Sequence, residues 1–303
     1  MALRRPFDDL VDLLEQLPTL KPAYAESGVL NGPFDQPIAK DDIYHLLIWL
    51  AEWQKTPAPK LNESYICVFA STYEGYNEQE RLASFIDGAG KGREPVSNLC
   101  KERGVGLRVL EMALKVPHAV SENWPERDCM AATAFGMQAT AAGGDILGLA
   151  SISPGNQYYC RALCQKLEKS TAHEKQNATK NGDFRALAIS VLELMKNNAG
   201  REVAAMLGAL IAARSASLPV LVEGWSGIAA LSILTAIGPR LTDHIKVASV
   251  ECKEQSEVVA AIGMQPIVGG TVNLGAGCGI AIAFSSIAPL LNLTLRESET
   301  TTS

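Results

Sequence analysis

Five short, continuous apolar runs recur along the chain, and each is followed by a stretch long enough to form a helix. The runs begin at Tyr65, Gly106, Asp145, Leu218 and His244. Few of their residues alternate with polar ones, which is typical of strands that are covered on both faces. The Ala- and Leu-rich stretches between them have the 3.6-residue period of helices. The sequence therefore predicts an α/β protein with a mostly parallel sheet between two layers of helices.

One large domain with short extensions is the organisation that the length and pattern indicate. The chain has 303 residues, of which 47% are hydrophobic and 20% charged, so it can bury a large core and is not mainly disordered. Residues 1–60 contain two helical patterns, around 8–17 and 41–53, and no strand. We expect this helical region to pack on the main domain, residues 61–295, or on a second subunit. The polar residues 296–303 predict a flexible tail.

The net charge and the length of the apolar stretches disfavour two kinds of partner, nucleic acids and membranes. The 27 Lys and Arg residues against 33 Asp and Glu residues give a net charge of −6, which disfavours nucleic acid as a partner. The richest apolar stretch, 277–291, is interrupted by two serines and is shorter than the about 18 apolar residues of a membrane span. We therefore expect no membrane contact. The start of the chain has acidic residues among its leucines, so it predicts an amphipathic helix and not a signal peptide.

The seven cysteines are odd in number and contain no C-x-x-C pair. No histidine lies within metal-ligand spacing of any two of them. This pattern predicts reduced thiols in a cytoplasmic protein, with no metal site and no cofactor.

Glycine-rich turns provide the clearest local signals. Residues 274–279 contain three alternating glycines before an apolar helix, so backbone N–H groups can converge on an anion such as phosphate. The alternative is a tight strand-to-helix turn with close packing.

Two glutamates lie at positions that suggest a role. Glu223 ends an apolar run, where its carboxylate can accept a hydrogen bond from a ribose or base, or can take a proton. The alternative is that Glu223 is a surface residue beside a helix cap formed by Ser226. Glu202 lies in the first turn of a long helix, where the helix dipole alone explains it.

The C-terminal half of the chain resembles a known enzyme family. Segments 200–231 and 261–291 are similar to the nicotinate-nucleotide:dimethylbenzimidazole phosphoribosyltransferase family, residues 126–156 match moderately, and residues 38–110 match faintly in the same order. The resemblance implies a three-layer, Rossmann-like fold with a mostly parallel sheet, and a homodimer. It also implies a reaction in which a benzimidazole nitrogen displaces nicotinate from nicotinate mononucleotide.

The polar motifs of that family are altered in this chain. The Arg-Leu-Gly-Glu-Gly motif, whose glutamate is the family's general base, reads Asn-Leu-Gly-Ala-Gly over 273–277, so Ala276 stands at the base position. The family's Gly-Glu-Met-Gly-Ile-Gly-Asn loop reads Ala-Ser-Ile-Ser-Pro-Gly-Asn over 150–156, with Ser151 in place of a second glutamate. The polar stretch 168–183 predicts an exposed loop, and its part near Lys175 and Lys180 replaces the Gly-rich loop that precedes the family's phosphate-binding lysine.

A substrate site at the carboxyl ends of the strands follows from the resemblance. Glu223 is the best remaining carboxylate for proton removal, and we expect a small-molecule nucleotide or phosphate as the ligand. The expected substrate-binding residues are Ser151, Ser153, Gly155, Asn156, Lys180, Gly224, Ser249, Asn273, Leu274, Gly275, Ala276 and Gly277.

Two interpretations remain open at this point. The first is a diverged transferase that moves phosphoribosyl from nicotinate mononucleotide, or a related donor, to a nitrogenous base, although the general base is lost. The second is a non-catalytic homologue that binds a nucleotide or is the partner subunit of an active family member. An unrelated α/β binding protein would require the long C-terminal match to be accidental.

Overall fold

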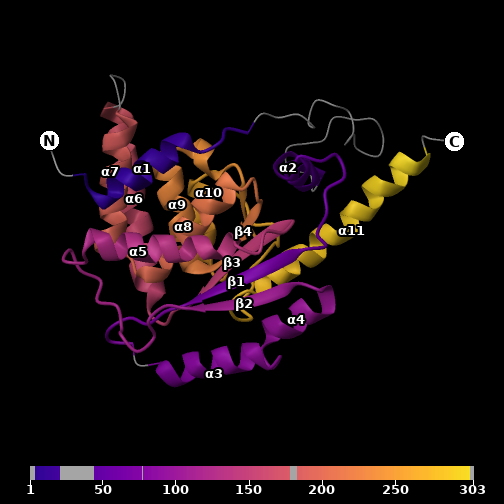
Figure 1. Cartoon of the computed structure of the whole chain (residues 1–303), viewed down its shortest axis with the longest axis horizontal. Helices are drawn as coiled ribbons and strands as arrows, with labels where there is room; N and C mark the ends of the chain where they lie inside the picture. Colours follow the sequence, from indigo (N-terminus) through magenta and orange to yellow (C-terminus); the bar gives the residue numbers. More distant parts are fainter. Residues whose placement is uncertain (1–3, 21–43, 77, 178–182, 301–303) are drawn as a thin grey trace.

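Five parallel strands form one sheet in the order β2-β1-β3-β4-β5 (Figure 1). The computed structural model describes residues 4–20, 44–76, 78–177 and 183–300. The strands are β1 (Ser64–Ala70), β2 (Gly106–Glu111), β3 (Ile146–Ile152), β4 (Val220–Val222) and β5 (Ile245–Val247). Each lies on one of the five apolar runs, so the predicted α/β fold is confirmed.

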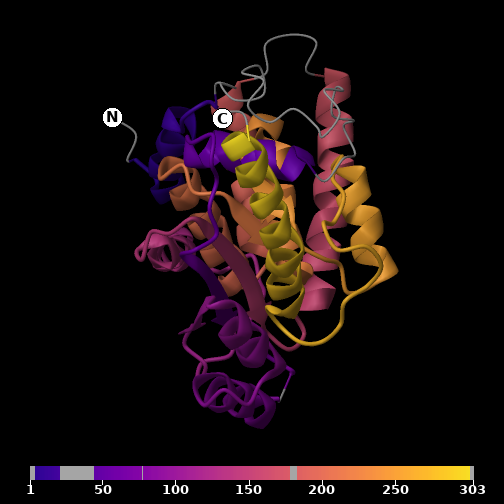
Figure 2. The ribbon, with the colours of Figure 1, turned by 90° about the vertical axis from the view of Figure 1, so that its right-hand side faces the viewer.

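Helices cover both faces of the sheet, which gives three layers (Figures 1 and 2). One face carries α1 (Pro6–Gln16), α5 (Glu126–Met137), α6 (Asn156–Asn177), α7 (Phe184–Asn198), α8 (Arg201–Ser215), α9 (Gly224–Ile237) and α10 (Lys253–Ala261). The other carries α2 (Tyr44–Gln54), α3 (Gln79–Gly90), α4 (Pro95–Arg103) and α11 (Cys278–Thr300). Two short 3-10 helices are η1 (Gln138–Thr140) and η2 (Pro239–Thr242).

Alternate residues of β1 belong to two separate hydrophobic cores. Cys67 and Phe69 are buried in the core beneath α8 and α9, whereas Ile66 and Val68 are buried beneath α4 and α11. Successive side chains of a strand point to opposite faces of the sheet. Both faces of the sheet are covered here, so polar residues do not alternate with apolar ones along the strand. The strand is therefore a continuous apolar run in the sequence.

The strand order creates a crevice beside β1. The chain passes from β1 to β2 on one side and then returns across β1 to β3 on the other. In open parallel sheets, ligands bind at such a switch point, outside the carboxyl ends of the strands. The turns that follow β1 and β3 are therefore the first place to look for a site.

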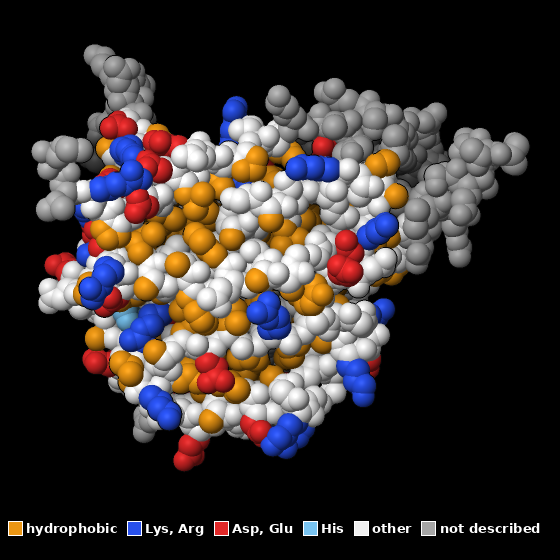
Figure 3. All heavy atoms as spheres, in the orientation of Figure 1, with side chains coloured by type: hydrophobic (Ala, Val, Ile, Leu, Met, Phe, Trp, Pro, Cys, Tyr) orange, Lys and Arg blue, Asp and Glu red, His pale blue; other side chains and the backbone are white. Residues whose placement is uncertain are grey.

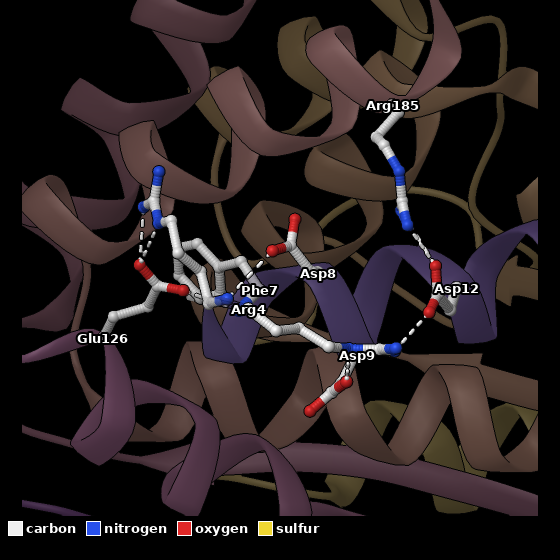
Figure 4. A network of polar contacts seen from close by, with 8 residues as sticks. Arg4, Phe7, Asp8, Asp9, Asp12, Glu126 and Arg185 are labelled. Carbon is white, nitrogen blue, oxygen red and sulfur yellow. Dashed lines mark hydrogen bonds and ion pairs between the residues drawn. The ribbon is translucent and has the colours of Figure 1, made fainter. Parts of the chain in front are cut away.

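The described part of the N-terminal region packs on the main domain. Helix α1 contacts α5 and α7, and its residues Phe7, Leu10 and Leu14 are buried. Figure 4 shows polar contacts that hold the helix: the backbone N–H of Phe7 donates to Glu126 over 2.6 Å, and Arg185 pairs with Asp12. Helix α2 packs on α11. Contact of this region with a second subunit stays a prediction.

Two segments differ from the sequence-based expectation. Helix α6 continues to Asn177, so the loop predicted over 168–183 is wrong for most of its length. That stretch has no Gly or Pro before Gly182, and a polar composition alone does not argue against a helix, because Lys, Glu and Gln are good helix formers. Helix α11 continues to Thr300 and so includes most of residues 296–303, where the sequence predicts a tail; the flexibility of this segment stays a prediction.

In the described ranges, no helix is both long enough and apolar enough to cross a membrane. All seven cysteines are free thiols, and Cys252 alone among them is not fully buried.

Helices α5 and α8 approach each other through two glycines. A Cβ atom added to Gly136 would overlap the carbonyl group of Ala205, and one added to Gly208 would overlap the carbonyl group of Thr133. Backbone atoms cannot move aside as the end of a flexible side chain can. The contact between these helices therefore requires glycine at both positions.

We expect Gly208→Ala to lower the free energy of unfolding by about 1–3 kcal/mol, the usual cost of overpacking. Alanine is the better helix former by about 1 kcal/mol, so a loss of stability would show that the contact outweighs helix propensity. Urea unfolding measures the change. Gly90→Ala is the control, because a Cβ at exposed Gly90 meets nothing within 4 Å. A Gly208→Ala variant as stable as the wild type would contradict this packing argument.

Candidate active site

A cavity of about 680 Å³ lies at the carboxyl ends of β1, β3 and β4. Its walls come from the turns after these strands, from α3 and α4, and from the segment that leads into α11. A cavity of this size is in the range that accommodates a small organic ligand. Nine of the twelve expected substrate-binding residues line it: Ser151, Ser153, Gly155, Asn156, Gly224, Asn273, Leu274, Gly275 and Ala276.

The other three expected residues lie elsewhere. Ser249 is buried behind the lining, where a Cβ on Gly279 would overlap its hydroxyl. Gly277 has a φ of +87°, and a Cβ there would lie 2.8 Å from a methyl group of Val96. Only glycine fits this turn without strain. Lys180 lies outside the described residues.

Glu223 holds the start of α11 against the end of β4. Its carboxylate accepts hydrogen bonds from the backbone N–H groups of Gly277 and Ile280, the latter over 2.9 Å. The first N–H groups of a helix lack partners within it, and a carboxylate at this end also interacts favourably with the helix dipole. Glu223 is only 4% exposed, so it is not the surface residue of the alternative interpretation. Its role in proton removal stays a prediction.

Burial raises the pKa of Glu223 to about 7, although the backbone N–H groups oppose this shift. The nearby carboxylate of Glu251 raises this pKa further. The group is therefore divided between its two protonation states near neutral pH.

Glu202 is the centre of a second buried network that the sequence did not reveal. Ser71 and Tyr73 donate hydrogen bonds to its carboxylate over 2.8 and 2.5 Å, and Ser226 donates over 3.3 Å. The side-chain amide of Asn156 in turn donates to Ser226 over 2.9 Å. Burial raises the pKa of Glu202, and its donors oppose the shift.

This network reaches the cavity through residues of its lining. The amide of Asn156 also donates to the hydroxyl of Ser151 over 3.3 Å, and both residues face the cavity. The buried carboxylate of Glu202 thereby helps to orient polar groups that a ligand would contact. The helix dipole is not the only reason for a glutamate at this position.

Tyrosines form one wall of the cavity. The rings of Tyr76 and Tyr158 stack with centroids 5.8 Å apart, and both line the cavity. Gly155 has a φ of +90°, and a Cβ there would overlap the ring of Tyr76. A flat, partly exposed aromatic surface of this kind suits a planar heterocycle.

The charged side chains of the lining are mostly acidic. Arg81 is the one cation among the lining residues that the structure describes, and it pairs with Glu78 over 2.9 Å. Glu94 and Glu251 also line the cavity. Among the described residues, no three His, Cys, Asp or Glu side chains converge to hold a metal ion.

Comparison with known proteins shows where this fold and cavity occur. The model of a family described as phosphoribosyltransferase matches residues 42–296. The chain belongs to the nicotinate-nucleotide:dimethylbenzimidazole phosphoribosyltransferase family. It is 30% identical to the nicotinate-nucleotide:dimethylbenzimidazole phosphoribosyltransferase of Rhizobium meliloti (strain 1021) over 92% of this chain and 90% of the relative. The same enzyme of Brucella anthropi is 28% identical over 93% of this chain and 92% of the relative.

Solved structures agree on the fold. A nicotinate-nucleotide:dimethylbenzimidazole phosphoribosyltransferase from Thermus thermophilus superposes with a TM-score of 0.67 at 18% identity, covering 95% of each chain. The predicted resemblance and the three-layer, Rossmann-like fold are thus both confirmed. Ala276 lies in the cavity lining, and its correspondence to the family's glutamate stays a prediction.

Stability should depend on pH through Glu223. Because folding raises its pKa from about 4.5 to about 7, the folded chain holds a proton that the unfolded chain releases between these values. The free energy of unfolding should therefore fall as pH rises through this range, by up to about 3 kcal/mol from this group. Urea unfolding at a series of pH values should show a smaller fall for Glu223→Gln than for the wild type. Parallel profiles for the two proteins would contradict the shift.

Proposed function

We propose that the chain transfers a phosphoribosyl group from nicotinate mononucleotide, or a related donor, to a ring nitrogen of a heterocyclic base. The observation that carries this proposal is the convergence of nine expected substrate-binding residues on one cavity at the switch point of the sheet. The relatives named for this reaction match over about nine-tenths of their length, which supports the same reaction for this chain.

Helix ends around the cavity suit the phosphate of such a donor. Helix α6 begins at Asn156 and α9 at Gly224, and both residues line the cavity. The N-terminus of a helix presents unpaired N–H groups and a partial positive charge to an anion. The donor phosphate therefore needs no lysine for its first contact, and Arg81 is the one cation that the described lining adds.

The leaving group of this reaction needs no proton from the protein. The C1′–N bond to the pyridinium breaks as the acceptor nitrogen bonds to C1′, and the electron pair returns to the pyridine ring, so no proton is needed there. The attacking ring nitrogen of the acceptor has a free lone pair, so the proton that must be lost is the one on the other ring nitrogen. Holding the two reactants in line is the main contribution of the site, and the tyrosine wall at Tyr76 and Tyr158 suits the flat acceptor.

Ala276 favours a second candidate function. Loss of a general base typically costs about 10²- to 10⁴-fold in rate, and Ser151 replaces a second carboxylate of the family motif. A non-catalytic nucleotide-binding homologue, or a partner subunit of an active family member, retains the cavity and lacks the turnover.

Transfer to dimethylbenzimidazole should be slow. We expect calorimetry to show that nicotinate mononucleotide binds. We expect chromatography to show that nicotinate is released at a rate well below about 1 per second, the lower end of the usual range for enzymes. Ala276→Glu should restore little, because Ser151 is also altered. Binding without any release would favour the non-catalytic alternative. Absence of binding at millimolar donor would contradict both functions, and turnover of about 1 to 10³ per second would contradict the predicted loss.

We further propose that the chain is a cytoplasmic homodimer. Figure 3 shows apolar side chains gathered across the middle of one face, over α5 and the adjoining strands. On α5, Ala131 and Ala134 are exposed and Met130 and Phe135 are half-buried. An apolar helix face of this kind is a common feature of a self-complementary interface.

Light scattering should give twice the chain mass of 32.4 kDa. We expect Ala134→Arg to shift the protein toward the monomer, because it places an unpaired charge in the interface. Ala83→Arg is the control, since Ala83 is exposed on α3, and Figure 1 shows α3 below α5 and the strands. A monomeric wild type across micromolar concentrations would contradict the dimer.

A further inference from the structure

The carboxylates around the cavity differ in how many of their oxygens already accept a hydrogen bond or form an ion pair within the protein. Both oxygens of Glu223 accept backbone N–H groups. Glu78 pairs with Arg81 over 2.9 Å at an exposed position. Glu94 precedes α4, and its carboxylate lies against Gly88 of α3, where it would overlap an added Cβ. Glu251 is the remaining carboxylate among the described lining residues.

Glu251 lies where the β4 turn meets the segment that contains Ala276. It follows β5 by way of Val250, whose carbonyl accepts the N–H of Val272 over 2.8 Å, one residue before Asn273. On its other side, a Cβ on Gly224 would lie 3.6 Å from Oε1 of Glu251. The carboxylate is therefore close to two segments that line the cavity.

One oxygen of Glu251 is held and the other is available. Gln255 is fully buried and donates from its amide nitrogen to Oε2 of Glu251 over 2.9 Å. The oxygen of the same amide accepts the backbone N–H of Glu251 over 2.8 Å. This closed pair of hydrogen bonds fixes the plane of the carboxylate. Oε1 has no hydrogen-bond partner within the described part of the chain.

A group with these properties suits proton transfer. General bases work best when their orientation is fixed and one oxygen is within reach of the proton. Partial burial raises the pKa of Glu251, and the hydrogen bond from Gln255 opposes the shift. A carboxyl with a raised pKa holds an abstracted proton more firmly than an exposed one does.

We propose that Glu251 takes over part of the role of the glutamate missing at position 276: it binds the ring N–H of the acceptor and takes its proton in the slow transfer expected above. This proposal rests on the proposed transferase function. In the step, the acceptor nitrogen bonds to C1′ while the C1′–pyridinium bond breaks and returns its electron pair to the leaving ring. This nitrogen is the one with a free lone pair, and the N–H proton on the other ring nitrogen of the acceptor passes to Oε1 of Glu251 and then to water.

Steady-state kinetics of Glu251→Gln tests the catalytic role. Glutamine retains the shape of glutamate and cannot accept the proton, so we expect kcat to fall about 10²-fold or more. Affinity for nicotinate mononucleotide, measured by calorimetry, should stay within about twofold, which also shows that the variant folds. Glu257→Gln is the matched control, because Glu257 is exposed on α10 and outside the cavity lining; its kcat should not change. A Glu251→Gln variant within threefold of the wild-type kcat would overturn the proposal and leave the transferase function intact.

Binding of a cationic acceptor analogue tests Glu251 independently of turnover. The probe is 2-aminobenzimidazole in its protonated form, titrated by calorimetry into the wild type and into Glu251→Gln. An ionised carboxylate that faces the acceptor should bind this cation at least tenfold more tightly than the glutamine does. If the wild type transfers nothing but shows this difference, the transferase function fails and the binding role of Glu251 stands. Equal affinities for the two proteins would overturn the binding role.

Discussion

The hydrogen bonds between the Glu223 carboxylate and the start of α11 are the interaction on which the candidate site most depends. Glu223 follows β4 directly. Its carboxylate accepts hydrogen bonds from the backbone N–H groups of Gly277 and Ile280, more than fifty residues later in the chain. The bonds hold the glycine turn onto the carboxyl end of the sheet, so that residues 273–276 become a wall of the cavity. Without a carboxylate at this point, the first N–H groups of α11 would be buried without partners.

A second buried carboxylate, Glu202, also joins separate elements behind the cavity lining. Glu202 joins the end of β1, through Ser71, to the start of α9, through Ser226. Asn156 extends this network to the lining. The two buried glutamates, Glu202 and Glu223, are structural supports of the cavity. A buried charge is costly unless it is hydrogen-bonded, and both carboxylates meet this condition.

The sequence predicted the sheet well because buried parallel strands are continuous apolar runs, and β1 to β5 each lie on one. Nine of the twelve substrate-binding residues expected from the family resemblance line the cavity, since the motifs that contain them are contiguous in the chain. The resemblance could not predict Glu202, Tyr158 or Glu251, whose partners are distant in the sequence and meet only after folding. The expected loop over 168–183 failed for another reason: polar composition was taken as evidence against a helix, yet Lys, Glu and Gln are good helix formers on a surface.

The cavity should hold a phosphoribosyl donor with its reactive carbon beside Glu251. A crystal structure of the protein with nicotinate mononucleotide tests this placement most directly. We expect the phosphate at the N-termini of α6 and α9, near Asn156 and Gly224, and the ribose C1′ between Gly224 and the Tyr76–Tyr158 wall. A nucleotide bound with its phosphate away from these helix ends, or bound outside the cavity, would contradict it.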